Sequence, residues 1–215
     1  MSSDAAAPAI VSIERDGPAV ARAALERCVG DGGVAVFPAD GLYGLACDPL
    51  DGTAIDRIQR LKGCDDRKPS AVMYFSPLVM RELVGDLGPR TAGAVGALLP
   101  RPVTLVVANP RHRYPLACRE DVERLGVRLL EGPLAGAMCP IFQTSANRSG
   151  EPAPARFDEV PRSILAGVDL AIDGGSLTGL PSTVVDVSGL DADGSWRILR
   201  QGALPAADVE AALGG

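Results

Sequence analysis

Histidine and aromatic side chains are scarce in this sequence. His112 is the only histidine among the 215 residues, and aromatic residues make up 4% of the chain. A serine–histidine triad or a histidine-rich metal cluster would therefore have to depend on His112. That residue lies in the polar stretch 109–113, which we expect to be a surface loop, so both kinds of site are disfavoured.

Paired cysteines and long apolar runs are also missing. The five cysteines contain no C-x-x-C pair and are Cys28, Cys47, Cys64, Cys118 and Cys139. Such an unpatterned set indicates free thiols rather than a disulfide framework or a zinc site. No apolar run approaches the ~20 residues of a membrane-spanning helix, and the N-terminus does not resemble a secretion signal. We therefore expect a cytoplasmic protein without a membrane segment, with a loose tail at 1–10 and one domain at 11–215.

Lysine is scarce as well, with two lysines against nineteen arginines and a net charge of −6. A negatively charged protein is a poor non-specific binder of nucleic acid, because such binding depends on neutralising phosphates. Both lysines, Lys62 and Lys68, fall in one short segment, which indicates a point-charge role in a local basic pocket. The phosphate-binding patterns G-x-x-x-x-G-K-[ST] and G-x-G-x-x-G are absent, so any nucleotide site is of a less common kind.

Hydrophobic periodicity predicts an α/β protein in which helices cover a sheet. We predict helices at 19–29, after Asp51, after Ser76, at 92–99 and after Pro205. Apolar segments predict strands at 33–38, 71–75, 103–108, 125–130, 140–145, 169–173, 182–187 and 196–200.

Five polar clusters flank these predicted strands, where α/β proteins usually place their sites. They are PADGLYGL (38–45), KGCDDRKP (62–69), TSANRSG (144–150), GLPST (179–183) and RQGA (200–203). Each cluster alone also fits an ordinary turn or a solvated loop. In the second cluster, for example, Asp65 and Asp66 lie among the cations.

Taken together and in order, the clusters are more specific, and the chain resembles the YrdC-like family of threonylcarbamoyl-adenylate synthases from about residue 12 to 210. TSANRSGEPAP and the pair PSTVVDV and ILRQG carry most of this resemblance. It implies a single-domain, twisted, open mixed sheet around a deep, positively lined concavity. It also implies a nucleotidyltransferase that joins L-threonine, bicarbonate and ATP into threonylcarbamoyl-AMP and releases pyrophosphate.

The product of that family supplies the threonylcarbamoyl group added to an adenosine of certain tRNAs. The resemblance therefore implies tRNA, or the downstream threonylcarbamoyl transferase, as a candidate partner. We expect Mg²⁺ to arrive with ATP, because no carboxylate cluster in the sequence suggests a protein metal site.

The resemblance also assigns site residues. It places Lys62, Ser145 and Asn147 in catalysis beside the nucleotide phosphates, and Arg128 and Ser182 in the threonine pocket. A guanidinium suits a carboxylate because it donates two parallel hydrogen bonds, and an ammonium suits a phosphate cluster. The nucleotide-binding residues that it implies are Lys62, Arg67, Lys68, Pro69, Ser145, Asn147 and Arg200.

The chain departs from the family pattern in three motifs, one of which, W-P-G-P-[LV]-T, reads LPRPVT at 99–104. Ala39 and Gly41 replace the hydroxyl residues of P-T-[DE]-T-V-Y-G, and Cys64 replaces the arginine of K-x-R. A missing donor at such a site costs ~1–3 kcal/mol or more. Three hypotheses stay open: a synthase with an altered site, a relative with weak or different carbamoyl or adenylate activity, and a non-catalytic module that binds double-stranded RNA or tRNA.

Overall fold

A computed structural model of the chain describes residues 7–63 and 70–214. Its strands are β1 (Ala9–Ser12), β2 (Ala35–Ala39), β3 (Leu42–Cys47), β4 (Ala71–Tyr74), β5 (Val103–Ala108), β6 (Arg124–Leu129), β7 (Ile141–Ser145), β8 (Leu170–Asp173), β9 (Thr183–Gly189) and β10 (Ser195–Arg200). Its α-helices are α1 (Ile13–Asp16), α2 (Pro18–Gly30), α3 (Gly52–Lys62), α4 (Pro77–Val84), α5 (Pro89–Leu98), α6 (Pro115–Cys118), α7 (Arg162–Leu165) and α8 (Ala206–Leu213). A single 3-10 turn covers Phe157–Glu159 in the described part of the chain.

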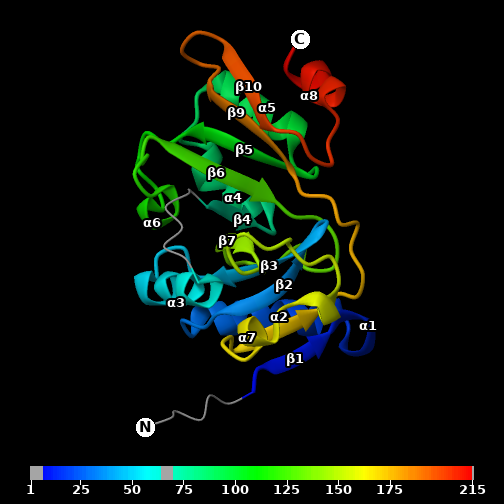
Figure 1. Cartoon of the computed structure of the whole chain (residues 1–215). Helices are drawn as coiled ribbons and strands as arrows, with labels where there is room; N and C mark the ends of the chain where they lie inside the picture. The colour runs from blue at the N-terminus through cyan, green and yellow to red at the C-terminus, as the bar shows by residue number, and fades with distance from the viewer. Residues whose placement is uncertain (1–6, 64–69, 215) are drawn as a thin grey trace.

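All ten of these strands join one mixed sheet in the order β1-β8-β2-β3-β7-β4-β6-β5-β9-β10. The pairs β1–β8, β2–β8, β4–β6 and β5–β9 are parallel, and the other neighbours are antiparallel. Figure 1 shows the strands stacked from β1 at one end of the molecule to β10 at the other, with a progressive twist. The predicted class, a twisted open mixed sheet with helices, is confirmed.

Helix ends follow the residues that predicted them. Oδ1 of Asp51 accepts hydrogen bonds from the backbone N–H groups of Thr53 and Ala54 at the start of α3. Ser76 caps α4 in the same way, and a proline follows it at the first helical position. Because side-chain oxygens satisfy N–H groups that have no partner within the helix, such residues fix where a helix begins.

Two strands differ from the sequence prediction. Strand β3 pairs with β2 through the two-residue turn Asp40–Gly41, in a segment that we expected to be only a polar turn. Its residues are almost all buried, so the strand lacks the polar–apolar alternation that marks a half-exposed strand. Residues 9 and 10 belong to β1, which pairs with β8, rather than to the expected N-terminal tail.

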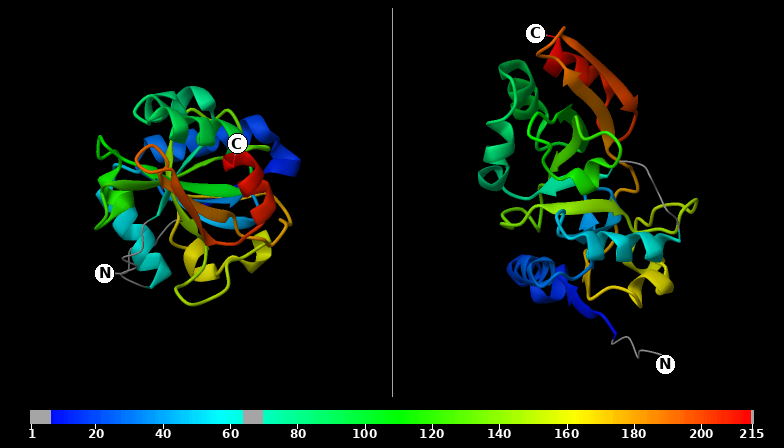
Figure 2. Two further views of the ribbon diagram at one scale, coloured as in Figure 1. Left: turned by 90° about the horizontal axis from the view of Figure 1, so that it is seen from above. Right: turned by 90° about the vertical axis from the view of Figure 1, so that its left-hand side faces the viewer.

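Helices cover both faces of the sheet, as Figure 2 shows from two directions. In β2, Ala35 and Phe37 pack with Leu25 of α2 in one hydrophobic cluster, whereas Val36 packs with Ile55 of α3 in the other. A strand that is covered on both faces needs apolar side chains at every position. This explains why the sequence of β2 reads as an uninterrupted apolar run.

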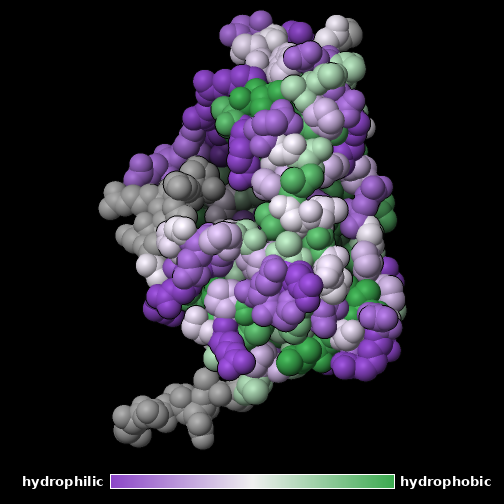
Figure 3. Space-filling view, turned by 45° about the vertical axis from the view of Figure 1, so that its right-hand side comes forward, coloured by the Kyte–Doolittle hydropathy of each residue, from purple (hydrophilic) through white to green (hydrophobic). Residues whose placement is uncertain are grey.

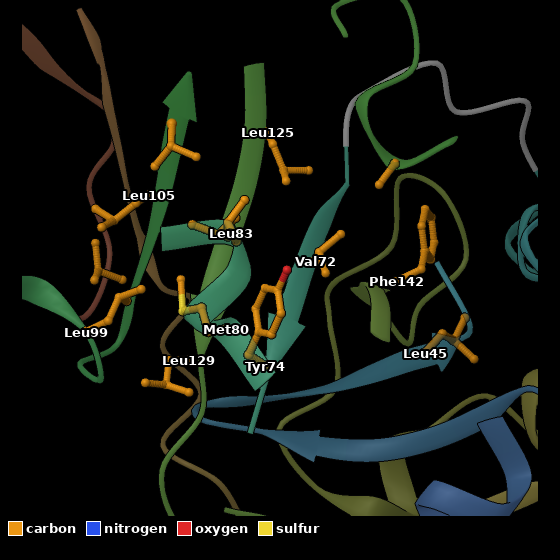
Figure 4. Packing of buried hydrophobic residues seen from close by; sticks show 14 of the residues in the cluster. Leu45, Val72, Tyr74, Met80, Leu83, Leu99, Leu105, Leu125, Leu129 and Phe142 are labelled. Atoms are coloured by element: carbon orange, nitrogen blue, oxygen red, sulfur yellow. The ribbon is translucent and has the colours of Figure 1, made fainter. Parts of the chain in front are cut away.

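The larger cluster extends to the β4, β5 and β6 part of the sheet. Figure 4 shows Tyr74 of β4 close to Met80 and Leu83 of α4, with Leu105 and Leu125 on the neighbouring strands. All five side chains are buried. This packing makes the sheet a rigid support for the polar residues at its strand ends.

His112 and the described cysteines have the environments that the sequence predicts. His112 is exposed and bonds Glu123 through Nε2 at 2.8 Å, so it is a surface loop residue. The described cysteines, Cys28, Cys47, Cys118 and Cys139, are free thiols. Hydrophobic residues lie in small groups among polar ones on the face shown in Figure 3. Within residues 7–63 and 70–214, no helix has the length and apolar character needed to cross a membrane.

Candidate active site

A cavity of about 710 Å³ lies against the middle of the sheet. Its walls come from β3, β5, β6, β7 and β9 and from the segment 174–182 between β8 and β9, which we call the strap. Figure 1 shows the strap as the yellow-to-orange trace that connects the lower half of the sheet to the upper half. The polar lining includes Arg128, Ser145, Ser182 and Arg200, four residues predicted for the site.

An ion pair joins Arg128, which lines the cavity, to Asp40 at its edge. Nη2 of Arg128, on β6, donates to Oδ2 of Asp40 in the β2–β3 turn. In the sheet order, β7 and β4 separate β3 from β6, so a flat sheet would hold the two backbones roughly 14 Å apart. The two side chains nevertheless meet, so the ion pair spans this width beside the cavity that Arg128 lines.

Burial shifts the pKa values of both members of this pair. The side chain of Arg128 is 7% exposed, and burial lowers its pKa from the ordinary value while Asp40 acts against that change. The nearby charge of Arg200 lowers the pKa of Arg128 further. Burial also raises the pKa of Asp40, although Arg128 opposes the rise. The cavity therefore holds a buried guanidinium. Asp40 occupies one of its N–H donors, and the others can bind a further anion.

A second group joins the end of α3 to the end of β7. Nζ of Lys62 donates to the backbone oxygens of Ser145 at 2.6 Å and Asn147 at 3.1 Å, and it lies 3.4 Å from both side-chain oxygens. The amide of Asn147 in turn donates to the backbone oxygens of Arg148 and Glu151. Of these three residues, Ser145 lines the cavity. Lys62 and Asn147 lie behind it and hold the loop after β7 in place.

The upper wall of the cavity is a hydroxyl pair beside an arginine. Oγ of Ser182 lies 2.9 Å from Oγ1 of Thr104, and Nη2 of Arg200 donates to the backbone oxygen of Ser182 at 2.8 Å. Thr183, which follows Ser182 and begins β9, is fully buried. Its hydroxyl accepts hydrogen bonds from the backbone N–H groups of Gly202 and Leu204. The two family segments PSTVVDV and ILRQG therefore bind each other, which fixes Ser182 and Arg200 on one wall.

The strap reaches the β2–β3 turn at Gly41. The backbone N–H of Gly179 donates to the carbonyl of Gly41 at 2.9 Å. A Cβ atom at position 41 would collide with the carbonyl of Leu180 and lie 2.6 Å from Oγ1 of Thr178. The absence of a side chain at Gly41 is thus matched to a strap that occupies its place.

Tyr43 holds the start of the strap. Its hydroxyl accepts a hydrogen bond from the backbone N–H of Gly174 at 2.9 Å and donates to the carbonyl of Gly175 at 2.8 Å. Burial raises the pKa of this hydroxyl to about 12, so it keeps its proton at neutral pH. The strap is therefore anchored at Tyr43 of β3 and at Gly41 of the β2–β3 turn.

The structure brings together six of the predicted site residues, namely Lys62, Arg128, Ser145, Asn147, Ser182 and Arg200. The predictions for Arg67, Lys68 and Pro69, and the departure at Cys64, lie outside the described residues. The sequence analysis gave no role to Asp40 or Thr104. For Asp40 the signal was present, because an Asp-Gly pair directly follows a buried strand at the edge where the polar clusters gather.

A second and larger hollow, of about 880 Å³, lies between α2, β1, the loop before β2 and the start of β8. Its walls are mostly apolar and include Ala19, Val20, Ala23 and Ala24. None of the predicted site residues lines it. We therefore take the smaller cavity, with its converging cations and hydroxyls, as the functional site.

The Sua5_yciO_yrdC family model, described as "Telomere recombination", matches residues 27–202. The chain belongs to the Sua5/YciO/YrdC family. Among family members, a threonylcarbamoyl-AMP synthase of Nitrosococcus oceani is 31% identical over 153 residues, which cover 69% of this chain and 82% of that protein. One from Thiobacillus denitrificans is 32% identical over 163 residues, covering 73% and 86%.

Solved structures of the Sua5/YciO/YrdC family have the same architecture. Pyrococcus abyssi Sua5 complexed with L-threonine superimposes with a TM-score of 0.81 at 26% identity, over 96% of this chain and 60% of that one. E. coli YciO gives a TM-score of 0.77 over 97% and 100% of the two chains. Its identity is 22%, so that likeness concerns the fold alone.

Proposed function

We propose that this chain is an L-threonylcarbamoyladenylate synthase, which converts L-threonine, bicarbonate and ATP into threonylcarbamoyl-AMP and pyrophosphate. The observation that carries the proposal is one cavity lined by a buried guanidinium, Arg128, and by the loop that Lys62 fixes at Ser145. A reaction between an amino acid and a nucleoside triphosphate needs a site for a carboxylate and a site for phosphates within one enclosure. The matches to threonylcarbamoyl-AMP synthases support the same activity.

Arg128 binds the carboxylate of threonine in this proposal. Its burial leaves the guanidinium with little water, and a carboxylate that accepts two of its N–H groups replaces that hydration. Ser182 and Thr104 stand on the adjoining wall as neutral hydroxyls. They provide hydrogen bonds to the amino acid without adding a second charge.

The nucleotide phosphates lie near Ser145 and Arg200 in this proposal, with Lys62 and Asn147 holding the Ser145 loop. Mg²⁺ enters on the ATP phosphates, because no three His, Cys, Asp or Glu side chains in the described segments could hold a metal ion. Arg67, Lys68 and Pro69 remain predicted contacts of the same phosphates. Charge on the displaced pyrophosphate grows during the reaction, and fixed cations stabilise it.

The product points to tRNA, or to the transferase that uses threonylcarbamoyl-AMP, as the onward partner, and to the cytoplasm as the location. A second candidate is a related activity with a different amino-group donor. Ala39 and Gly41 favour it, because they leave the β2–β3 turn without the hydroxyls that the family places there. The net charge of −6 makes a purely RNA-binding role the weakest of the three.

The decisive experiment measures pyrophosphate release by the purified protein with ATP, Mg²⁺ and bicarbonate, with and without L-threonine. Threonine-dependent release together with threonylcarbamoyl-AMP, detected by mass spectrometry, supports the synthase. Release that depends on another amino acid supports the second candidate. Absence of ATP binding at millimolar ligand would contradict both enzyme hypotheses.

A further inference from the structure

We infer that Asp40 is a catalytic residue that binds the α-ammonium group of the amino-acid substrate and takes its proton. This inference rests on the proposed function, and it assigns a task in the reaction to the partner of Arg128. The two observations that carry it are the ion pair between Asp40 and Arg128 and the place of Asp40 between two residues of the cavity wall, Ala39 and Leu42.

The pair matches the charged groups of an α-amino acid. Arg128 presents a cation and Asp40 an anion in direct contact, at the edge of one cavity. The carboxylate and the ammonium of an amino acid are attached to the same carbon atom. When the carboxylate occupies the remaining donors of Arg128, the ammonium therefore lies beside Asp40.

The reaction requires a base at this place. The new N–C bond forms when the nitrogen lone pair attacks the carbon of bicarbonate, but an ammonium group has no lone pair. The carboxylate of Asp40 takes one proton from the ammonium and becomes a carboxylic acid, which leaves the neutral amine. The amine and bicarbonate then give the carbamate and one water molecule, and the acid returns its proton to solvent.

The surroundings of Asp40 suit this exchange. Its side chain is 24% exposed, so the proton can pass to water after transfer. Burial and the charge of Glu131 raise the pKa of Asp40, which makes the carboxylate a stronger base, while Arg128 opposes the rise. Arg200 acts on the same pair through Arg128. Among the described residues, Arg128 and Glu131 are the charged groups that act directly on Asp40.

The backbone of Asp40 allows a clean test. Its φ of 49° lies in the left-handed region, which asparagine and glycine tolerate better than other residues. Asp40→Asn keeps the shape and the acceptor for Arg128 but cannot take a proton, and Asp40→Gly is a second variant with the same backbone preference. Asp208→Asn is the matched control, since it makes the same change in another ion-paired aspartate, which lies on α8 and bonds Arg101 at 3.4 Å.

The experiment measures threonine-dependent pyrophosphate release from neutral pH to about pH 9, and L-threonine binding by calorimetry. At neutral pH, Asp40→Asn should turn over about 100-fold more slowly than the unchanged protein and still bind L-threonine. Its rate should then rise about tenfold per pH unit, because only the free amine in solution can react. The unchanged protein and Asp208→Asn should show a much flatter profile.

Each result decides a different question. If the unchanged protein shows no threonine-dependent release, the proposed function fails, and this inference fails with it. If the protein is active but both Asp40 variants keep its flat profile, the inference alone is overturned, and Asp40 only positions Arg128. Loss of L-threonine binding with an unchanged profile would likewise restrict Asp40 to binding and overturn its role as a base.

Discussion

Replacing Thr183 by valine should destabilise the fold and loosen the wall that carries Arg200. The Thr183 hydroxyl donates to the carbonyl of Leu204 at 2.6 Å and accepts from the N–H groups of Gly202 and Leu204 at 3.0 and 3.1 Å. Valine has nearly the same shape, so the substitution removes these bonds without creating a cavity. The Leu204 carbonyl keeps the side-chain amide of Gln201 as a donor at 2.7 Å. The two N–H groups lose their acceptor.

A buried donor without a partner costs ~1–3 kcal/mol, so Thr183→Val should lower the free energy of unfolding by about 2–4 kcal/mol. For a chain of this size, that corresponds to a fall in Tm of about 5–15 °C. Thr104→Val is the matched control, because it removes one buried hydroxyl pair, with Ser182, and should cost about 1 kcal/mol.

Urea unfolding of both variants, followed by far-UV circular dichroism, measures these differences. The denaturant dependence should stay unchanged, since neither substitution alters the surface exposed on unfolding. An effect of Thr183→Val no larger than that of Thr104→Val would show that the hydrogen bonds of the Thr183 hydroxyl do not act together. In that case, the bonds between Thr183 and the segment after β10 would not hold Arg200 in its position.

Three further predictions concern the cavity. Lys62→Met should weaken ATP binding more than L-threonine binding, and Arg128→Met should do the reverse. Calorimetry with each ligand measures both affinities. Equal losses of both ligands in folded variants would contradict the assignment of Lys62 to the nucleotide and Arg128 to the amino acid. Gly41→Ala should lower Tm and L-threonine affinity because the strap occupies the position of its Cβ atom, whereas Gly93→Ala, which meets open space within α5, should raise Tm slightly. Cys64→Arg should increase threonylcarbamoyl-AMP formation about tenfold, by adding the fixed charge of the family motif; unchanged turnover would show that position 64 does not act on the phosphates.

Local sequence determined much of the secondary structure. Asp51 and Ser76 predicted where α3 and α4 begin, because their side chains satisfy backbone groups only a few residues away. Apolar runs predicted most strands for a similar reason, since burial on both faces leaves no polar position. Strand β3 could not be found in this way, because Asp40, Gly41 and Gly44 are residues typical of turns, and only pairing with β2 and β7 makes the segment a strand.

The order of motifs along the chain also determined the family, and with it six residues, four of which line one cavity while Lys62 and Asn147 bond the Ser145 loop. It did not determine how they contact one another. The ion pair of Arg128 with Asp40 joins residues 88 positions apart, and the bonds of Lys62 to the Ser145 loop join residues 83 positions apart. Such contacts depend on strand order and on the accumulated twist of the sheet, which are properties of the whole fold. The sequence alone therefore determined which charged and polar groups this protein has for its chemistry, and the tertiary structure decided that an aspartate stands beside the buried arginine.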